Sequence, residues 1–221
     1  MVDTSSSRQD ALRQLSEALL RSAGRTRVRC NVLELHHPGA PLFDPFLLNG
    51  TGPALGVSIS LSLDTQATEG QPVRCRSAQL PFQDGAFGMV VLHHVIGNGD
   101  EPELAEAARV LSGSGVLLVL GLNRFGWRYR AQRDGRRLPG LAPLRVGARL
   151  DRLDMVLQGF AGAGLAGRER PAFMNSGPLG LLSPLADVVL LQAQHRGGPG
   201  VMPLRFRKSR AHVVQSAAMR G

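Results

Sequence analysis

The chain has 221 residues, of which 43% are hydrophobic and 19% are charged. This length favours one large domain, and no apolar run approaches the roughly 20 residues that a membrane span needs. The first ten residues lack the features of a secretory signal, and Cys30 and Cys75 lack the spacing of a metal or redox pair. We therefore expect a cytoplasmic protein with no membrane partner.

The formal net charge of +9 raises the question of a nucleic-acid partner, because basic residues neutralise phosphates. Lys208 is the only lysine among 26 basic residues, so arginine use is biased along the whole chain. Only residues 133–137 and 205–210 are locally dense in arginine. A solvated basic surface is therefore the main interpretation, and nucleic-acid binding is the alternative.

The N-terminal segment predicts an amphipathic helix that Gly24 ends. Its polar sequence carries leucines at helical spacing: Leu12, Leu15, Leu19 and Leu20. We treat residues 1–24 as an N-terminal helix that precedes the main domain.

The next segments predict strands of a parallel sheet. Residues 31–35 form a short apolar run that stops at a His-His-Pro-Gly turn, and residues 54–61 and 72–76 are plausible second and third strands. Residues 86–92 are continuously apolar, which is typical of a strand buried on both faces. We expect this strand to lie beside 31–35.

A helix and a strong strand follow. Asp100 is expected to cap the helix, with Glu103 completing a capping box and Pro102 in the first turn. The helix should end near Leu111, before the apolar strand 115–122. Such alternation of strands and helices predicts an α/β fold.

The C-terminal third is less regular. Residues 150–160 place apolar side chains on one helical face, and we expect a helix there. Residues 186–194 predict a final strand. From 197 onwards the chain is arginine-rich, and we expect an exposed basic tail over 197–221.

The stretch from Leu80 to Asn123 resembles the central segment of class I S-adenosylmethionine-dependent methyltransferases of the type 11 group. In that family an LPF-x-D-x-x-F block precedes a buried strand, an ARVL-x-x-G-G helix ending follows, and the next strand closes on Asn or a small residue. This chain has LPFQDGAF, ARVLSGSG and a strand that ends at Asn123.

The resemblance implies a Rossmann-like α/β domain, which we place at residues 25–196. The family sheet has seven strands in the order 3-2-1-4-5-7-6, with strand 7 antiparallel and helices on both faces. Its ligand, S-adenosylmethionine, lies over the carboxyl ends of strands 1 and 4, where the strand order reverses.

The positions that bind the cofactor in the family carry different residues here. The Gly-rich turn is His36-His37-Pro38-Gly39, so only Gly39 remains. Ser58 and Arg76 replace two acids. Loss of two charge-assisted hydrogen bonds costs on the order of 3 to 6 kcal/mol, or two to four decades in affinity. The remaining residues that the resemblance places near the cofactor are Glu34, Leu80 and His93.

The histidines fall in two adjacent pairs, 36–37 and 93–94, at the ends of two strands expected to be neighbours. A metal or anion site is one interpretation, because imidazole is a common metal ligand. Adjacent residues at a strand end point in opposite directions, so at most one ring of each pair should face the crevice. Packed or solvated histidines are the main interpretation, and we assign no metal ligands.

Two residues are candidates for catalysis. His94 matches a family position near the substrate and could act as a base or a positioning donor. Asn123 could line the pocket or simply cap a turn. Trp127 and Tyr129 could shape an acceptor pocket, although a lone tryptophan after a strand is more often in the core.

The sequence supports two functions. The first is a divergent methyltransferase that transfers a methyl group from S-adenosylmethionine to an unknown small-molecule or protein acceptor. The second is a catalytically inactive protein of the same fold, a pseudoenzyme that serves as a binding partner or scaffold. Fold alone does not decide between them.

Overall fold

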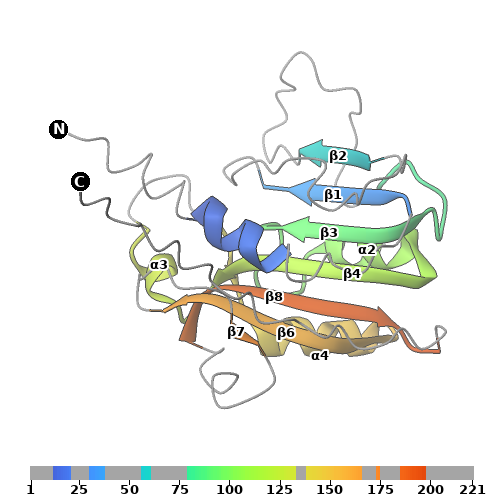
Figure 1. Cartoon of the computed structure of the whole chain (residues 1–221). Coiled ribbons are helices and arrows are strands. Elements are labelled where there is room, and N and C mark those ends of the chain that lie inside the picture. Colours follow the sequence, from blue (N-terminus) through green and yellow to red (C-terminus); the bar gives the residue numbers. More distant parts are fainter. Residues whose placement is uncertain are drawn as a thin grey trace, which may run out of the picture.

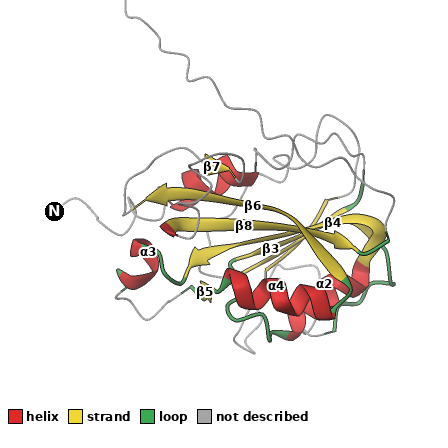
Figure 2. Cartoon of the chain, turned by 90° about the horizontal axis from the view of Figure 1, so that it is seen from below, coloured by secondary structure: helices red, strands yellow, loops and turns green. Residues whose placement is uncertain are grey.

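The computed structural model describes residues 12–20, 30–37, 56–60, 79–132, 138–165, 173–174 and 185–197. These residues form a mixed β-sheet with helices on both faces (Figures 1 and 2). No helix among them is long and apolar enough to cross a membrane.

Four parallel strands build one half of the sheet. β1 (Val32–His36) lies between β2 (Gly56–Ser60) and β3 (Phe87–His93), and β4 (Leu111–Asn123) pairs with the other side of β3. The predicted parallel pairing, with the continuously apolar strand beside the first, is confirmed for these four. The predicted strand at 72–76 lies outside the described residues.

The other half of the sheet is antiparallel. β8 (Ala186–His195), which was predicted, runs antiparallel to β4 and to β6 (Met155–Leu165). β7 (Phe173–Met174) extends the edge at β6, and β5 (Gly140–Leu141) pairs with the end of β4.

The strand arrangement differs in part from the one that the resemblance implies. The described order is β2-β1-β3-β4-β8-β6-β7, with β5 attached to β4. The two-residue strands β5 and β7 have no counterpart in the expected seven. The segment expected to form the third strand lies outside the described residues, as do 198–221 of the expected basic tail.

The helix predicted after residue 100 is present as α2 (Pro102–Val110), but its predicted cap is wrong. Pro102 occupies the first helical position, which makes Glu101 rather than Asp100 the N-cap residue. No side chain caps the helix, so the predicted capping box with Glu103 does not form. The carboxylate of Glu101 turns back and accepts hydrogen bonds of 2.7 to 2.9 Å from three amides of the preceding loop, those of Gly97, Asn98 and Gly99.

The single helix predicted at 150–160 is also wrong. This segment contains the end of α4 (Pro143–Arg152) and the first half of β6. Asp154 adopts a left-handed conformation with φ 57°, which ends the helical path and starts the strand. Leu150 faces the core from the helix and Met155 from the strand, so one apolar pattern spans two elements.

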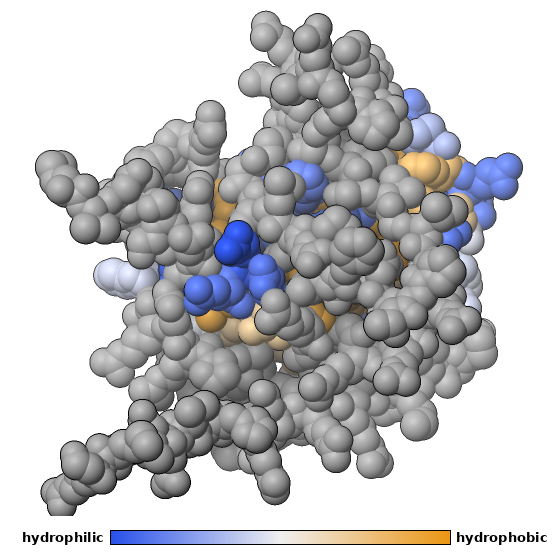
Figure 3. Space-filling model, turned by 45° about the horizontal axis from the view of Figure 1, so that its top comes forward, coloured by the Kyte–Doolittle hydropathy of each residue, from blue (hydrophilic) through white to orange (hydrophobic). Residues whose placement is uncertain are grey.

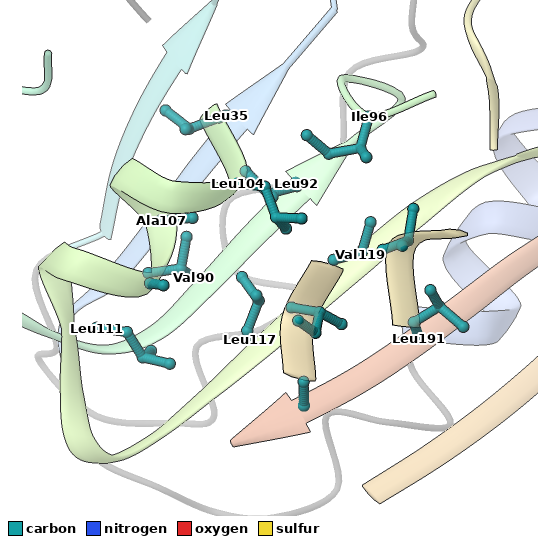
Figure 4. Packing of buried hydrophobic residues seen from close by; sticks show 14 of the residues in the cluster. Leu35, Val90, Leu92, Ile96, Leu104, Ala107, Leu111, Leu117, Val119 and Leu191 are labelled. Atoms are coloured by element: carbon teal, nitrogen blue, oxygen red, sulfur yellow. The ribbon is translucent and has the colours of Figure 1, made fainter. Parts of the chain in front are cut away.

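Each face of the sheet carries its own hydrophobic core. On one face α2 and α4 cover β3, β4 and β8, and Figure 4 shows Leu104 and Ala107 of α2 over Val90 and Leu92 of β3. The helix at residues 12–20 covers the opposite face. Its four predicted apolar positions are all buried there, so this helix packs as part of the same body. On the face in Figure 3, a hydrophilic group of described residues lies directly beside hydrophobic surface.

Candidate functional site

The carboxyl ends of β1 and β3 bring the two histidine pairs together. His36, the last residue of β1, is in register with His93, the last residue of β3. The amide of His37 then donates a 3.0 Å hydrogen bond to the carbonyl of His93. The prediction that the pairs would be neighbours, made from strand adjacency, is therefore confirmed.

His93 and His94 do not diverge as an extended strand would require. Both side chains are fully buried, and their ring centroids lie 4.8 Å apart. His94 has φ 55°, in the left-handed region that few residues other than glycine adopt. Its amide donates a 2.7 Å hydrogen bond to the carbonyl of Leu120 in β4, which holds this turn in place. The left-handed residue breaks the strand alternation, so the expectation that these two rings would point apart is wrong.

Burial keeps these imidazoles neutral. It lowers the pKa of His93 and of His94 well below the ordinary value, and the neighbouring histidines lower each pKa further. Burial and His36 also lower the pKa of His37. Glu34 Oε1 lies 3.5 Å from His93 Nδ1, but the carboxylate does not offset the cost of burying a charged ring. The contact is therefore a neutral imidazole beside a carboxylate rather than an ion pair.

His94 has the most distinctive environment of the four. Neither of its ring nitrogens has a hydrogen-bond partner among the described residues, although the side chain is fully buried. Buried polar groups usually have partners, because an unmade hydrogen bond costs about 1 to 3 kcal/mol. A neutral imidazole can donate one hydrogen bond and accept another, so His94 could engage a ligand group in both ways.

Asn123, the other predicted catalytic residue, holds a turn together. Its side chain is fully buried, its Nδ2 donates a 2.8 Å hydrogen bond to the carbonyl of Ala186, and its Oδ1 accepts one of 3.1 Å from the amide of Phe125. These bonds fix the end of β4 against the start of β8. The turn-capping interpretation therefore accounts for both polar atoms of the Asn123 side chain.

The residues predicted to bind the cofactor are only partly described. Ser58 pairs in register with Glu34 across β2 and β1, which places the two positions on the same face of the sheet. His36 is 6% exposed and also belongs to this face. Gly39 and Arg76 lie outside the described residues. The described part therefore brings Glu34, His36, Ser58 and His93 to one end of β1–β3.

Leu80 is buried in the core, and its main chain is fully engaged. Its amide donates a 2.9 Å hydrogen bond to Glu106 Oε2, and its carbonyl accepts one of 3.1 Å from Arg109 Nη2. Arg109 also binds the carbonyl of Phe82 at 2.9 Å and Asp84 Oδ1 at 2.6 Å. We call these five residues the Arg109 clasp.

Charge pairing reinforces the Arg109 clasp. Two Arg109 nitrogens contact the two carboxylate oxygens of Glu106 at 2.8 and 2.9 Å. Hydrogen bonding to Arg109 lowers the pKa of Glu106 and, in return, the pKa of Arg109 is raised. Sequence reasoning missed this linkage. Its signal was present in the LPFQD and ARVL motifs, which contribute the loop and the helix that the clasp joins.

The aromatic residues after β4 occupy a short helix, α3 (Trp127–Arg130). Trp127 is 62% exposed, so the interpretation of the lone tryptophan as a core residue is wrong. Tyr129 packs against the backbone of Gly140, where a Cβ atom would lie 2.5 Å from its ring.

The described residues offer no group of three or more His, Cys, Asp or Glu side chains placed to hold a metal ion. The metal interpretation of the histidine pairs therefore gains no support from this part of the chain. The packed interpretation agrees with the burial of His36, His93 and His94.

Comparison with solved structures identifies the fold. No protein-family model matches the sequence, and no curated protein matches it either. A SAM-dependent methyltransferase of Thermotoga maritima matches with a TM-score of 0.52 and 12% identity, over 84% of this chain and 90% of that one. A protein of Bacillus halodurans to which a methyltransferase function has been ascribed matches with a TM-score of 0.52 and 16% identity, over 81% and 98% of the two chains. The chain has the class I methyltransferase fold.

Proposed function

We propose that this chain is a divergent methyltransferase that transfers a methyl group from S-adenosylmethionine to an acceptor not yet identified. The fold supports this proposal, and His94 is the observation that carries it. A fully buried imidazole without a described hydrogen-bond partner, held at φ 55°, stands at the end of β3 where the fold places its ligand. Strained and unsatisfied polar residues of this kind concentrate at functional sites.

A different donor set from the one that the resemblance implies would hold the cofactor. Glu34 provides a carboxylate on β1, in register with Ser58 on β2, and the imidazoles of His36 and His93 lie at the adjacent strand ends. We assign these four residues to the cofactor. When bound, S-adenosylmethionine supplies a methyl group that its sulfonium already activates.

His94 would position the acceptor. Because burial favours the neutral ring, its unprotonated nitrogen can accept a hydrogen bond from an acceptor O–H or N–H group. The same burial opposes formation of an imidazolium cation. His94 is therefore better suited to orient the acceptor's lone pair toward the methyl group than to hold its proton. Asn123 would keep the end of β4 rigid beside it.

Titration calorimetry with S-adenosylmethionine and S-adenosylhomocysteine tests the proposal. We expect binding weaker than about 100 μM, because the missing acids cost roughly two to four decades of a micromolar affinity. Ser58→Asp combined with Arg76→Asp should recover a measurable part of that loss. The matched change Arg145→Asp, on the exposed side of α4, should leave the affinity unchanged.

The inactive alternative is favoured by the burial of His36 and His93 at the edge where the cofactor should enter. If these rings block the site, restoring the acids will do nothing until His36→Gly and His37→Gly are added. Absence of binding even then would leave the scaffold function as the better conclusion. Tight binding by the unmodified protein, at about micromolar or better, would instead contradict the argument from altered motifs.

A further inference from the structure

Three large apolar side chains protrude into solvent around the turn that follows β4. Phe125 is 60% exposed, Trp127 is 62% exposed, and Leu185, just before β8, is 55% exposed. Isolated exposed apolar residues are normal, whereas exposed apolar residues that lie close together can mark an interaction surface. The large hydrophobic side chains exposed elsewhere among the described residues are Leu144 and Leu157.

The backbone of this turn is held against the start of β8. Gly126, between the two aromatic residues, lies so close to β8 that a Cβ atom would be 2.9 Å from the carbonyl of Ala186. The amide of Arg128 donates a 3.1 Å hydrogen bond to the fully buried Asp187, and Asn123 binds both sides of the same junction. In the chain, Phe125 and Trp127 flank Gly126, and Leu185 precedes Ala186. The backbone that carries all three exposed side chains is therefore fixed by this junction.

Positive charges flank this group in the chain. Arg124 and Arg130 are exposed and flank the aromatic residues in the chain. No residue from 123 to 132 is acidic. The neighbouring acid, Asp187, is buried and lies 3.8 Å from Arg128 Nε. A binding partner should thus combine an apolar layer with negative charge.

The group also lies at the functional edge of the sheet. It follows the carboxyl end of β4, and the preceding strand, β3, ends at the same edge with His94 bound to Leu120 of β4. A partner seated here would border the crevice in which the fold places its ligand.

We propose that Phe125, Trp127, Leu185, Arg124 and Arg130, here called the aromatic platform, bind the surface of an anionic phospholipid bilayer. Tryptophan favours the interfacial layer of a membrane, and the phenylalanine and leucine side chains would enter the boundary of the acyl chains. The two arginines would contact lipid phosphates. A surface contact requires no spanning segment, so this proposal revises the sequence-based expectation of no membrane partner. It does not depend on methyl transfer.

Lipid fits this surface better than single-stranded nucleic acid does. Nucleic acid would also use arginines and stacking on aromatic rings. Leu185, however, is one third of the exposed apolar group and has no aromatic face on which a base could stack. An acyl boundary uses all three side chains.

The chain contains a single tryptophan, and it belongs to the platform, which supplies a direct reporter. The full-length protein is titrated with phosphatidylglycerol vesicles and with phosphatidylcholine vesicles. We expect a blue shift of Trp127 emission and co-sedimentation with the anionic vesicles alone, with quenching when brominated phosphatidylglycerol is used. Added salt should weaken the binding, because the arginine contacts are screened.

Matched variants separate the apolar and charged contributions. Phe125→Ser with Leu185→Ser keeps the reporter and should weaken binding about tenfold or more, since two apolar side chains lose their insertion. Arg124→Gln with Arg130→Gln should weaken it roughly 30-fold, at about fivefold for each arginine. Leu157→Ser and Arg152→Gln alter exposed residues near the end of β8 that lies opposite Leu185. Neither change should have an effect.

Three results would overturn the proposal. The first is an unchanged Trp127 spectrum without co-sedimentation on anionic vesicles. The second is binding that the Leu157→Ser control reduces as much as the platform variants do. The third is quenching of Trp127 by a single-stranded oligonucleotide while anionic vesicles have no effect, which would assign the platform to nucleic acid.

Discussion

The Arg109 clasp and the histidine cluster at the ends of β1 and β3 lie in the same half of the sheet. They differ in how many of their polar groups have hydrogen-bond partners. In the clasp, each polar group has a charged or backbone partner, and the pKa shifts of Glu106 and Arg109 favour their charged forms. In the cluster, His93 and His94 are buried in their neutral forms, and His94 lacks a described hydrogen-bond partner.

This difference shows what the sequence resemblance reports. In this chain the LPFQD and ARVL motifs build the clasp that holds a loop on α2. A strong motif match can therefore identify a fold through its structural joints, while the residues that determine binding differ.

The largest expected effect is an acid-dependent loss of stability from the histidine cluster. Because the pKa values of His93 and His94 are lowered in the folded protein, below about pH 6.5 the unfolded chain binds protons that the folded chain does not. Stability should be constant above that pH. Below it, stability should fall steadily as the pH falls, because His93 and His94 take up protons in the unfolded chain before they do so in the folded one. Urea unfolding at a series of pH values measures this.

His94→Asn is the matched variant for that experiment. Asparagine tolerates the left-handed conformation at this position and does not titrate. It should roughly halve the dependence on pH. A free energy of unfolding that stays flat from pH 8 to pH 5 would show that the two rings do not resist protonation.

A smaller effect is expected from Arg109→Leu, which removes the centre of the clasp. Glu106 and the carbonyls of Leu80 and Phe82 would lose their partner, so we expect a loss of about 3 kcal/mol in the free energy of unfolding. Arg109→Lys should lose less, because the charge remains while the planar donor set is lost.

The control for the clasp is Arg145→Leu, which alters an exposed residue of α4 and should change stability by less than about 0.5 kcal/mol. Equal effects of the two leucine substitutions in thermal or urea unfolding would contradict the assignment of Arg109 as a structural joint.

The smallest effect concerns Glu101, which joins the loop after β3 to α2. Glu101→Gln keeps one oxygen acceptor but removes the charge that binds the amides of Gly97, Asn98 and Gly99. We expect a loss of about 1 to 2 kcal/mol, measured by urea unfolding. Glu103→Gln, two residues along the same helix, serves as the comparison. If Glu103→Gln costs as much, the effect belongs to the helix dipole rather than to the loop.

The sequence predicted the elements whose apolar pattern has one explanation. The strand before His93 is apolar throughout, and α2 has its proline at the first position, so both were located within one or two residues. The helix prediction for residues 150–160 was wrong because the apolar residues there suit either a helix or a strand. Asp154, whose backbone is left-handed, separates α4 from β6, and the apolar pattern does not indicate this break.

The candidate site was likewise predicted only in part. Strand adjacency was enough to bring the histidine pairs together, since His36 and His93 end neighbouring parallel strands. The approach of the His93 and His94 rings could not be predicted, because it depends on one backbone torsion at His94. Asn123 gave no signal to separate a pocket residue from a turn cap. Its partner, Ala186, is 63 residues away in the chain.

The direct junction between α2 and β4 has a consequence for how the chain folds. Val110 ends the helix and Leu111 begins β4, which pairs with β3 at Leu111 and again from Val116 after a shift in register. β4 is also the strand that joins the parallel half of the sheet to the antiparallel half. A helix and a strand joined by so short a segment close their contacts at little entropic cost, whereas pairing with β8 must wait for a distant segment. We expect α2 and the centre of β4 to form the earliest and slowest-exchanging unit of the protein, onto which the two halves of the sheet then assemble.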